Sequence, residues 1–155
     1  MAMADIKGLL IFIVEKVRLA FDLDQVDRVV RACTLKPLPG SPDTVLGMLN
    51  LNGIPVPVVS LRKKLGFDER EMDTTDEIII VKREEALIGV LVDEVEDVTH
   101  TKEITKLPSA AELTHLRGAL HIHGDIVLIH DIDRFFSQSE ELALAKAFIR
   151  GTADK

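Results

Sequence analysis

The chain of 155 residues has no tryptophan, no tyrosine and only one cysteine. Because the single thiol of Cys33 cannot form an internal disulfide, the sequence does not belong to the disulfide-stabilised secreted class, and it fits a reducing compartment. We therefore expect a cytoplasmic protein. Six phenylalanines are its only aromatic side chains, and they are too scattered to form a platform on which nucleic-acid bases could stack.

Positive charge and membrane-spanning segments are also lacking. The chain has 19 Lys+Arg against 26 Asp+Glu, a net charge of −7, and its longest basic cluster covers only residues 62–64, so nucleic acid is a poor partner. The longest uncharged stretch, residues 44–61, contains Asn, Gly and Pro residues that break a helix and resist lipid. The apolar run Leu9–Val14 is too short for a signal peptide.

Hydrophobic residues make up 46% of the chain, enough for a substantial core without disulfides or a structural metal. They are grouped in short segments rich in Val, Ile and Leu that alternate with turn residues such as Asn52-Gly53 and His123-Gly124-Asp125, which predicts a mostly antiparallel β protein. The expected strands are Leu9–Val14, Arg18–Leu23, Val26–Cys33, Leu46–Leu51, Val56–Leu61, Ile78–Val81, Leu87–Val92, Leu120–Ile122 and Ile126–Ile132. Two helices are expected, a short one at Leu61–Gly66 and a longer one at Ser137–Arg150, which begins with the capping box Ser137-x-x-Glu140.

An internal duplication is visible when the chain is compared with itself. Residues 47–53 match residues 118–124 at an offset of 71, and upstream Ala20 matches Gly89 at an offset of 69. The halves cover approximately residues 9–66 and 78–136, followed by the helix at 137–150, within one domain of residues 1–155. Each half has about five short strands, too few for a broad sandwich, so we predict that the halves form two tandem five-stranded SH3-like barrels.

Side-chain alternation predicts which residues of each hairpin face its barrel core. The expected inward residues are Leu49, Leu51, Val56, Val58, Leu120, Ile122, Val127 and Ile129. The opposite faces also carry apolar residues, among them Val59 and Leu128, which indicates burial against the other barrel or against a partner.

Two alternatives to a binding role can be examined from the residues. His121, His123 and His130 share one expected face and resemble a zinc ligand set, but the matching residues Asn50, Asn52 and Val59 include no ligands. No nucleophile–base pair or phosphate-binding loop is recognisable. The acidic stretch Asp93–Asp97 is interpreted as a solvated strand edge or turn.

Several stretches together resemble the CheW-like domains of the bacterial chemotaxis coupling protein and of its histidine kinase. They are residues 20–30, Leu38-Pro39, the pattern running from Gly47 through Asn50-Leu51 and Gly53 to Pro57-Val58 and Leu61-Arg62, residues 89–95 and residues 118–132. The resemblance covers roughly residues 9–144.

The resemblance implies a non-enzymatic adaptor without a cofactor, which couples the cytoplasmic tip of a chemoreceptor to the regulatory domain of a histidine kinase. The family binds kinase domains at its two ends and the receptor between its barrels. The positions that this implies for partner binding are Arg28, Asn50, Asn52, Gly53, Pro55, Pro57, Val59, Ser60 and Arg62.

At three of these positions the chain departs from the family pattern. The family often has an acidic residue where Arg28 stands, an arginine at Asn52 and an aspartate at Ser60. Such changes of charge favour an atypical receptor or kinase as partner. A metal-binding protein or enzyme built on the three histidines and a structural homo-oligomer remain the alternatives.

Overall fold

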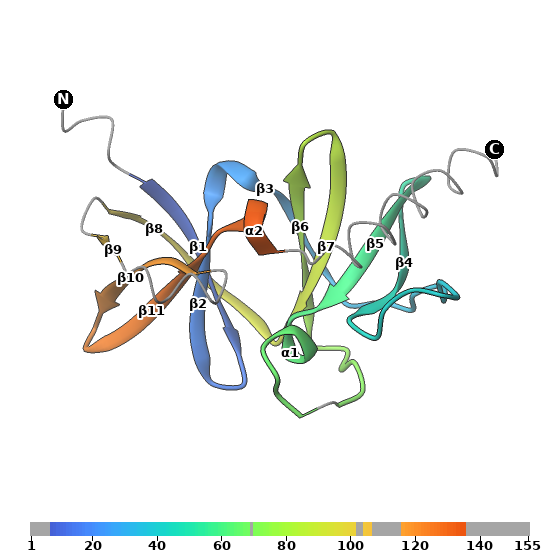
Figure 1. The fold of residues 1–155 in the computed structure, drawn as a ribbon, viewed down its shortest axis with the longest axis horizontal. Coiled ribbons are helices and arrows are strands. Elements are labelled where there is room, and N and C mark those ends of the chain that lie inside the picture. Colours follow the sequence, from blue (N-terminus) through green and yellow to red (C-terminus); the bar gives the residue numbers. More distant parts are fainter. Residues whose placement is uncertain (1–6, 69, 102–103, 107–115, 136–155) are drawn as a thin grey trace.

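The computed structural model describes residues 7–68, 70–101, 104–106 and 116–135, and the predicted helix Ser137–Arg150 lies outside these residues. The described chain is mostly β, as predicted, with two four-residue α-helices (Figure 1). Its strands are β1 (Lys7–Val14), β2 (Val17–Asp22), β3 (Val26–Arg31), β4 (Val45–Leu51), β5 (Ile54–Ser60), β6 (Glu77–Arg83), β7 (Ala86–Val92), β8 (Glu94–Thr101), β9 (Thr105–Lys106), β10 (Leu116–Ile122) and β11 (Asp125–His130). The helices are α1 (Leu61–Lys64) and α2 (Ile132–Phe135), and a 3₁₀ turn η2 covers Leu23–Gln25.

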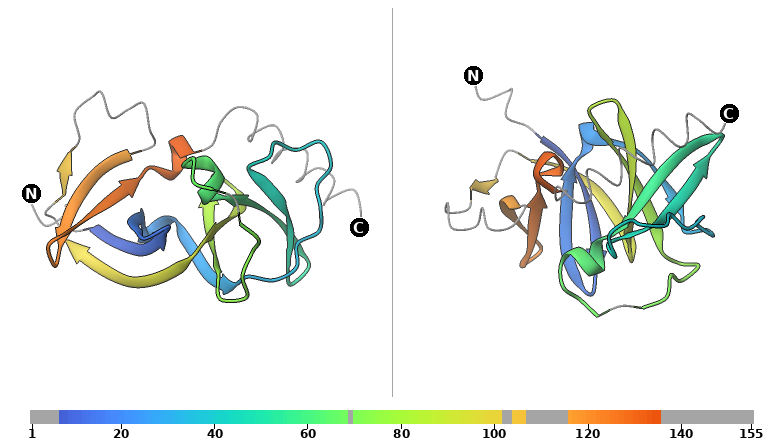
Figure 2. Two further views of the ribbon diagram at one scale, coloured as in Figure 1. Left: turned by 90° about the horizontal axis from the view of Figure 1, so that it is seen from below. Right: turned by 45° about the vertical axis from the view of Figure 1, so that its right-hand side comes forward.

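The strands form two sheets, which confirms the prediction of two SH3-like units. Sheet A has the order β8-β1-β2-β11-β10-β9, and sheet B has the order β3-β6-β7-β5-β4. The sheets lie side by side with α1 and α2 at their junction (Figures 1 and 2). Sheet A includes β8 and the two-residue β9, neither of which was among the expected strands.

The assignment of one barrel to each consecutive half of the chain is wrong. Sheet A combines the β1–β2 hairpin of the first half with β8 to β11 of the second, whereas sheet B combines β3 to β5 of the first half with the β6–β7 hairpin of the second. The alternating pattern of a strand shows which face is buried, but it does not identify the neighbouring strand. The halves are therefore interlocked rather than in tandem.

The strand pairing repeats with the offsets found in the sequence. Val58 on β5 is opposite Gly89 on the parallel strand β7, and the matching residues Ile129 and Ala20 are opposite each other on β11 and β2. The β4–β5 pair has a bulge between Val45 and Gly47, and the β10–β11 pair has one at the equivalent positions. The two sheets thus share one topology and one register.

Glycine at position 47 is required by a close approach of two chain segments. Its φ is 151°, and a Cβ added there would lie 2.6 Å from the carbonyl oxygen of Lys36. The equivalent Gly118 lies in the same way against Thr105, whose carbonyl oxygen would be 2.9 Å from an added Cβ. A side chain at either position would separate the strand from the segment that pairs with it.

Buried side chains form three clusters. One lies within sheet A around Leu120, Val127 and Ile129, and one within sheet B around Leu49, Val56 and Val58; both contain residues predicted to face inward. The third and largest lies between the sheets, and its members are Leu10, Phe12, Val14, Leu19, Phe21, Val45, Val59, Leu61, Ile79, Val81, Ile88, Val90, Val92 and Ile132. Strands at the junction therefore bury both faces, which explains the apolar residues on the supposedly outward faces.

Candidate partner-binding surface

The nine residues expected to bind partners fall into separate groups in the structure. Asn50, Asn52 and Gly53 lie at the tip of the β4–β5 hairpin, while Pro55, Pro57 and Val59 follow along β5. Ser60 and Arg62 lie at the far end of β5, beside α1. Arg28 lies on β3, at the opposite edge of sheet B from β4. The described structure does not bring all nine together.

The hairpin tip is the exposed part of this set. Asn52 and Gly53 have φ values of 52° and 89°, the left-handed backbone that a two-residue turn between antiparallel strands needs. The Gly53 N–H donates to Asn50 Oδ1 at 2.7 Å, which fixes the turn from within. The next residue, Ile54, is 51% exposed and was not singled out from the sequence; Ile126, beside the equivalent β10–β11 turn, is equally exposed.

Three of the expected residues are buried instead. Pro57 lies within the sheet, Val59 belongs to the cluster between the sheets, and Ser60 is 6% exposed. The Ser60 hydroxyl accepts the backbone N–H of Lys63 and caps α1. In the described structure these side chains support the fold and offer little surface to a partner, because β5 lies at the junction with its second face covered.

Arg62 is held by two carboxylates from the other side of the junction. Its guanidinium donates to Asp93 through Nη2 at 2.7 Å and Nε at 3.2 Å, and it also pairs with Glu15 in the β1–β2 turn. Its side chain is only 14% exposed. Bidentate pairs of this kind are strong and directional. Arg62 therefore connects the two sheets and presents little free charge to a partner.

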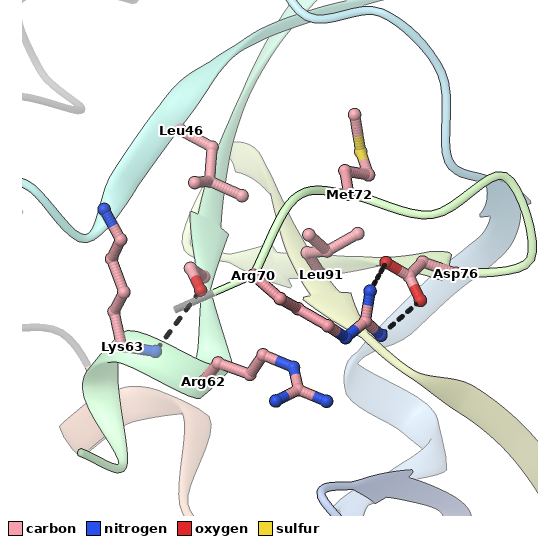
Figure 3. Close-up of a pocket in the computed structure, with 8 residues that line it drawn as sticks. Leu46, Arg62, Lys63, Arg70, Met72, Asp76 and Leu91 are labelled. Carbon is pink, nitrogen blue, oxygen red and sulfur yellow. Dashed lines mark hydrogen bonds and ion pairs between the residues drawn. The ribbon is translucent and has the colours of Figure 1, made fainter. Parts of the chain in front are cut away.

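A small pocket lies beside these ion pairs (Figure 3). It has a volume of about 60 Å³ and is lined by Leu46, Ser60, Arg62, Lys63, Arg70, Met72, Asp76 and Leu91. Arg70 donates from both terminal nitrogens to the buried Asp76, at 2.7 and 3.0 Å, and also reaches Asp93 at 3.1 Å. The hydrogen bond to Asp76 raises the pKa of Arg70. The pocket is small, and the two arginines that line it, Arg62 and Arg70, already pair with carboxylates.

Arg28 remains an exposed cation on the edge of sheet B. Its side chain is 49% exposed and donates from Nε to Asp27 at 2.7 Å. Adjacent exposed ion pairs of this type contribute little to stability. The residue is therefore accessible for contact with a partner, although it lies away from the β4–β5 tip.

The three histidines of the metal alternative are not gathered into one site. His121 and His123 are exposed near the β10–β11 turn, whereas His130 is buried. His121 is opposite Ile126, four residues before His130, so His130 lies about 13 Å further along the strand. Among the described residues, no group of three or more His, Cys, Asp or Glu side chains is placed to hold a metal ion.

The acidic stretch at 93–97 is mostly part of β8, at the edge of sheet A, which agrees with its interpretation as a solvated strand edge. Arg18 on β2 donates to Glu96 at 2.9 Å and to Asp125. These hydrogen bonds raise the pKa of Arg18, and the one to Asp125 lowers the pKa of that carboxyl. Charged residues of this kind discourage edge-to-edge pairing with other strands.

Within the described ranges, no helix is both long enough and apolar enough to cross a membrane. The fold is an interlocked two-barrel β domain, and the β4–β5 tip is among the exposed hairpin tips of sheet B.

Comparison with known proteins agrees with this description. The family model of the CheW-like domain matches residues 8–140. Chemotaxis protein CheW of Thermotoga maritima is 31% identical over 137 residues, which cover 82% of this chain and 85% of that protein. Chemotaxis protein CheW of Rhizobium meliloti is 31% identical over 112 residues, covering 69% and 72%. The chain belongs to the CheW-like domain family.

A solved structure shows the same fold. The crystal structure of the scaffolding protein TtCheW from Thermoanaerobacter tengcongensis superposes with a TM-score of 0.79 at 24% identity, covering 86% of this chain and 94% of that one. The interlocked pair of sheets is therefore also found in a protein that is described as a scaffold.

Proposed function

We propose that this chain is a non-enzymatic adaptor that couples the cytoplasmic tip of a chemoreceptor to the regulatory domain of a histidine kinase, in chemotaxis-type signalling in the cytoplasm. The match of the family model to residues 8–140 carries this proposal. The relatives named chemotaxis protein CheW and the scaffold with the same fold support it. An adaptor needs exposed contact surfaces on a folded core, and the interlocked sheets have a large shared core.

The tip of the β4–β5 hairpin is the part of the predicted surface that we propose contacts a partner. Asn50 and Asn52 are exposed there, and Ile54 adds an exposed apolar side chain next to them. An apolar side chain ringed by polar ones is a common composition for a protein–protein contact. Arg28 is proposed as a contact for a second partner, or for a different part of the same one, because it lies on the opposite edge of the sheet.

The charges on this surface bear on partner choice. Arg28 is a cation where the family often has an acidic residue, and Asn52 is neutral where the family often has arginine. We propose that the partner is matched to these charges and differs from the standard receptor or kinase at the facing positions, because a reversed sign opposes binding of the standard partner.

Two measurements on purified protein test the proposal against its alternatives. Titration with a receptor-tip fragment and with a kinase regulatory domain from the same cell should show saturable binding to each. A homo-oligomer would instead sediment as a stable dimer and bind neither fragment, and that outcome would refute the adaptor role. A metalloprotein would contain stoichiometric zinc after purification without a histidine tag.

A further inference from the structure

The chain crosses between the sheets at two places in the described structure. It passes from β7 in sheet B to β8 in sheet A at the single residue Asp93, and from β2 in sheet A to β3 in sheet B through Leu23–Gln25. The duplication makes these crossings equivalent, because Asp24 matches Asp93. In Figure 1 the first crossing lies at the lower end of the junction, near α1, and the second at the upper end, near α2.

The lower crossing is held by a cluster of ionic hydrogen bonds, which we call the Asp93 clamp and define as Glu15, Arg62, Arg70 and Asp93. The Asp93 carboxylate accepts hydrogen bonds from Arg62, from Arg70 at 3.1 Å and from the backbone N–H of Glu15 at 2.9 Å. The Asp93 N–H also donates to the carbonyl oxygen of Ile13 at 3.0 Å. The clamp joins the β1–β2 turn of sheet A to α1 and the following loop of sheet B.

The backbone of the β1–β2 turn also depends on the clamp. Glu15 and Lys16 have φ values of 50° and 68°, a left-handed conformation that is unfavourable for residues with a side chain. The clamp binds both the N–H and the carboxylate of Glu15, so it holds the strained residue in place.

The upper crossing lacks the clamp, and the chain passes it through the three-residue turn Leu23–Gln25 rather than at a single residue. The residues that match Glu15, Arg62 and Asp93 are Glu84, Asp133 and Asp24, three carboxylates with no cation among them. Glu84 has the equivalent left-handed φ of 57°. Within the described residues, the side chains of Asp24, Glu84 and Asp133 make no hydrogen bond or ion pair, and a side-chain contact at this crossing is the long hydrogen bond from Arg83 Nη2 to the Asp133 carbonyl oxygen, at 3.4 Å.

From this asymmetry we infer that the junction between the sheets is a one-ended hinge: the Asp93 clamp fixes the lower crossing, and the sheets move relative to each other at the upper crossing. The inference is independent of the proposed function and goes beyond it. A partner that contacts both sheets would bind one relative orientation of the sheets better than the others. Because the clamp fixes one end of the junction, it limits the orientations that are available to such a partner.

Amide hydrogen exchange measured residue by residue by NMR tests the inference on the full chain. After correction for intrinsic rates, the amides of Glu15 and Asp93 should exchange at least about tenfold more slowly than those of the matched residues Glu84 and Asp24, since hydrogen bonds to charged groups stabilise by that order. Exchange rates at the two crossings that agree within about twofold would overturn it, and this comparison needs no variant.

A pair of matched variants provides the second test. Asp93→Asn should accelerate exchange at Glu15 by about tenfold and leave Glu84 unchanged, whereas the control Asp24→Asn should change neither. If Asp93→Asn is too unstable to study, Arg62→Lys can replace it, because lysine keeps the positive charge but loses the bidentate geometry. Arg62→Lys should also accelerate hydrogen exchange of the Glu15 amide. An unchanged Glu15 amide in the folded variant, or equal acceleration by Asp24→Asn, would contradict the inference.

Discussion

Neighbouring residues at the β4–β5 hairpin should respond to substitution in opposite ways. Leu51 is the last residue of β4, is 8% exposed and packs into the core of sheet B. Asn52 follows it at the exposed turn, with its side chain outside every buried cluster. We predict that Leu51→Ala reduces stability and reduces binding only through unfolding, whereas Asn52→Glu reduces binding with little loss of stability.

The magnitudes follow from the two environments. Leu51→Ala leaves a cavity beside Leu49 and Val56 and should cost about 2–5 kcal/mol, towards the lower limit because the site lies at the end of a strand. Asn52→Glu should cost about 0.5–1 kcal/mol, because glutamate is less suited than asparagine to φ near 52°. Glutamate is tolerated in this conformation, as Glu15 and Glu84 at 50° and 57° demonstrate in the same chain.

The assay combines thermal unfolding of both variants with binding titrations against the receptor-tip fragment and the kinase regulatory domain. A folded Asn52→Glu protein should bind at least one of the two more weakly than the unmodified protein. If it binds both with unchanged affinity, the placement of a partner at this hairpin is wrong, and Asn52 serves only the turn.

Three further predictions concern the fold and its charges. Gly89→Ala should lower the free energy of unfolding, measured with denaturant, by about 1–3 kcal/mol, because the added Cβ would lie 2.8 Å from Ile78 Cγ2 and 2.9 Å from Val58 Cγ2. An unchanged free energy of unfolding would show that β5 and β6 can move away from β7 without cost. The Arg18 hydrogen bond lowers the pKa of Asp125, so the stabilisation it gives is present above the ordinary carboxyl pKa of about 3.9 and is lost as the pH falls through the lowered value. Arg18→Gln should therefore raise the pKa of Asp125 in an NMR titration, and an unchanged value would mean that the pair does not form in solution. Zinc titrated into tag-free protein should show no saturable one-to-one binding, since His130 lies far along the strand from His121, and saturable binding abolished by His121→Ala would contradict this geometry.

The sequence was sufficient to predict the β class, the duplication and most strands, because alternation and turn residues are local signals. Val56, Val58, Val127 and Ile129 face the cores as alternation required. The pairing of strands was predicted wrongly, because the same alternating pattern fits either neighbour. Only the structure shows that the β1–β2 hairpin joins β11 and that β6–β7 joins β5.

The candidate surface was predicted less well, for related reasons. Val59 was expected to face outward because one face of β5 was already assigned to the barrel core, and the contact between the sheets that covers the other face could not be located from alternation. β8 is absent from the expected strands, although residues 93–97 were interpreted as a strand edge or turn, because its acidic residues suit an exposed edge but give no apolar alternation. Arg62 was expected at a binding surface, yet its partners Glu15 and Asp93 are 47 and 31 residues away, a distance that sequence patterns do not bridge.

The adaptor role is tested most directly by reconstitution of receptor, kinase and this chain on membranes, with kinase autophosphorylation as the readout. We expect receptor-dependent control of the kinase to appear only when this chain is added, and Asn52→Glu to weaken that control while Asp24→Asn, at an exposed site outside the proposed surface, leaves it intact. Receptor control of the kinase that is the same with and without this chain, using the cognate receptor and kinase, would contradict the adaptor role.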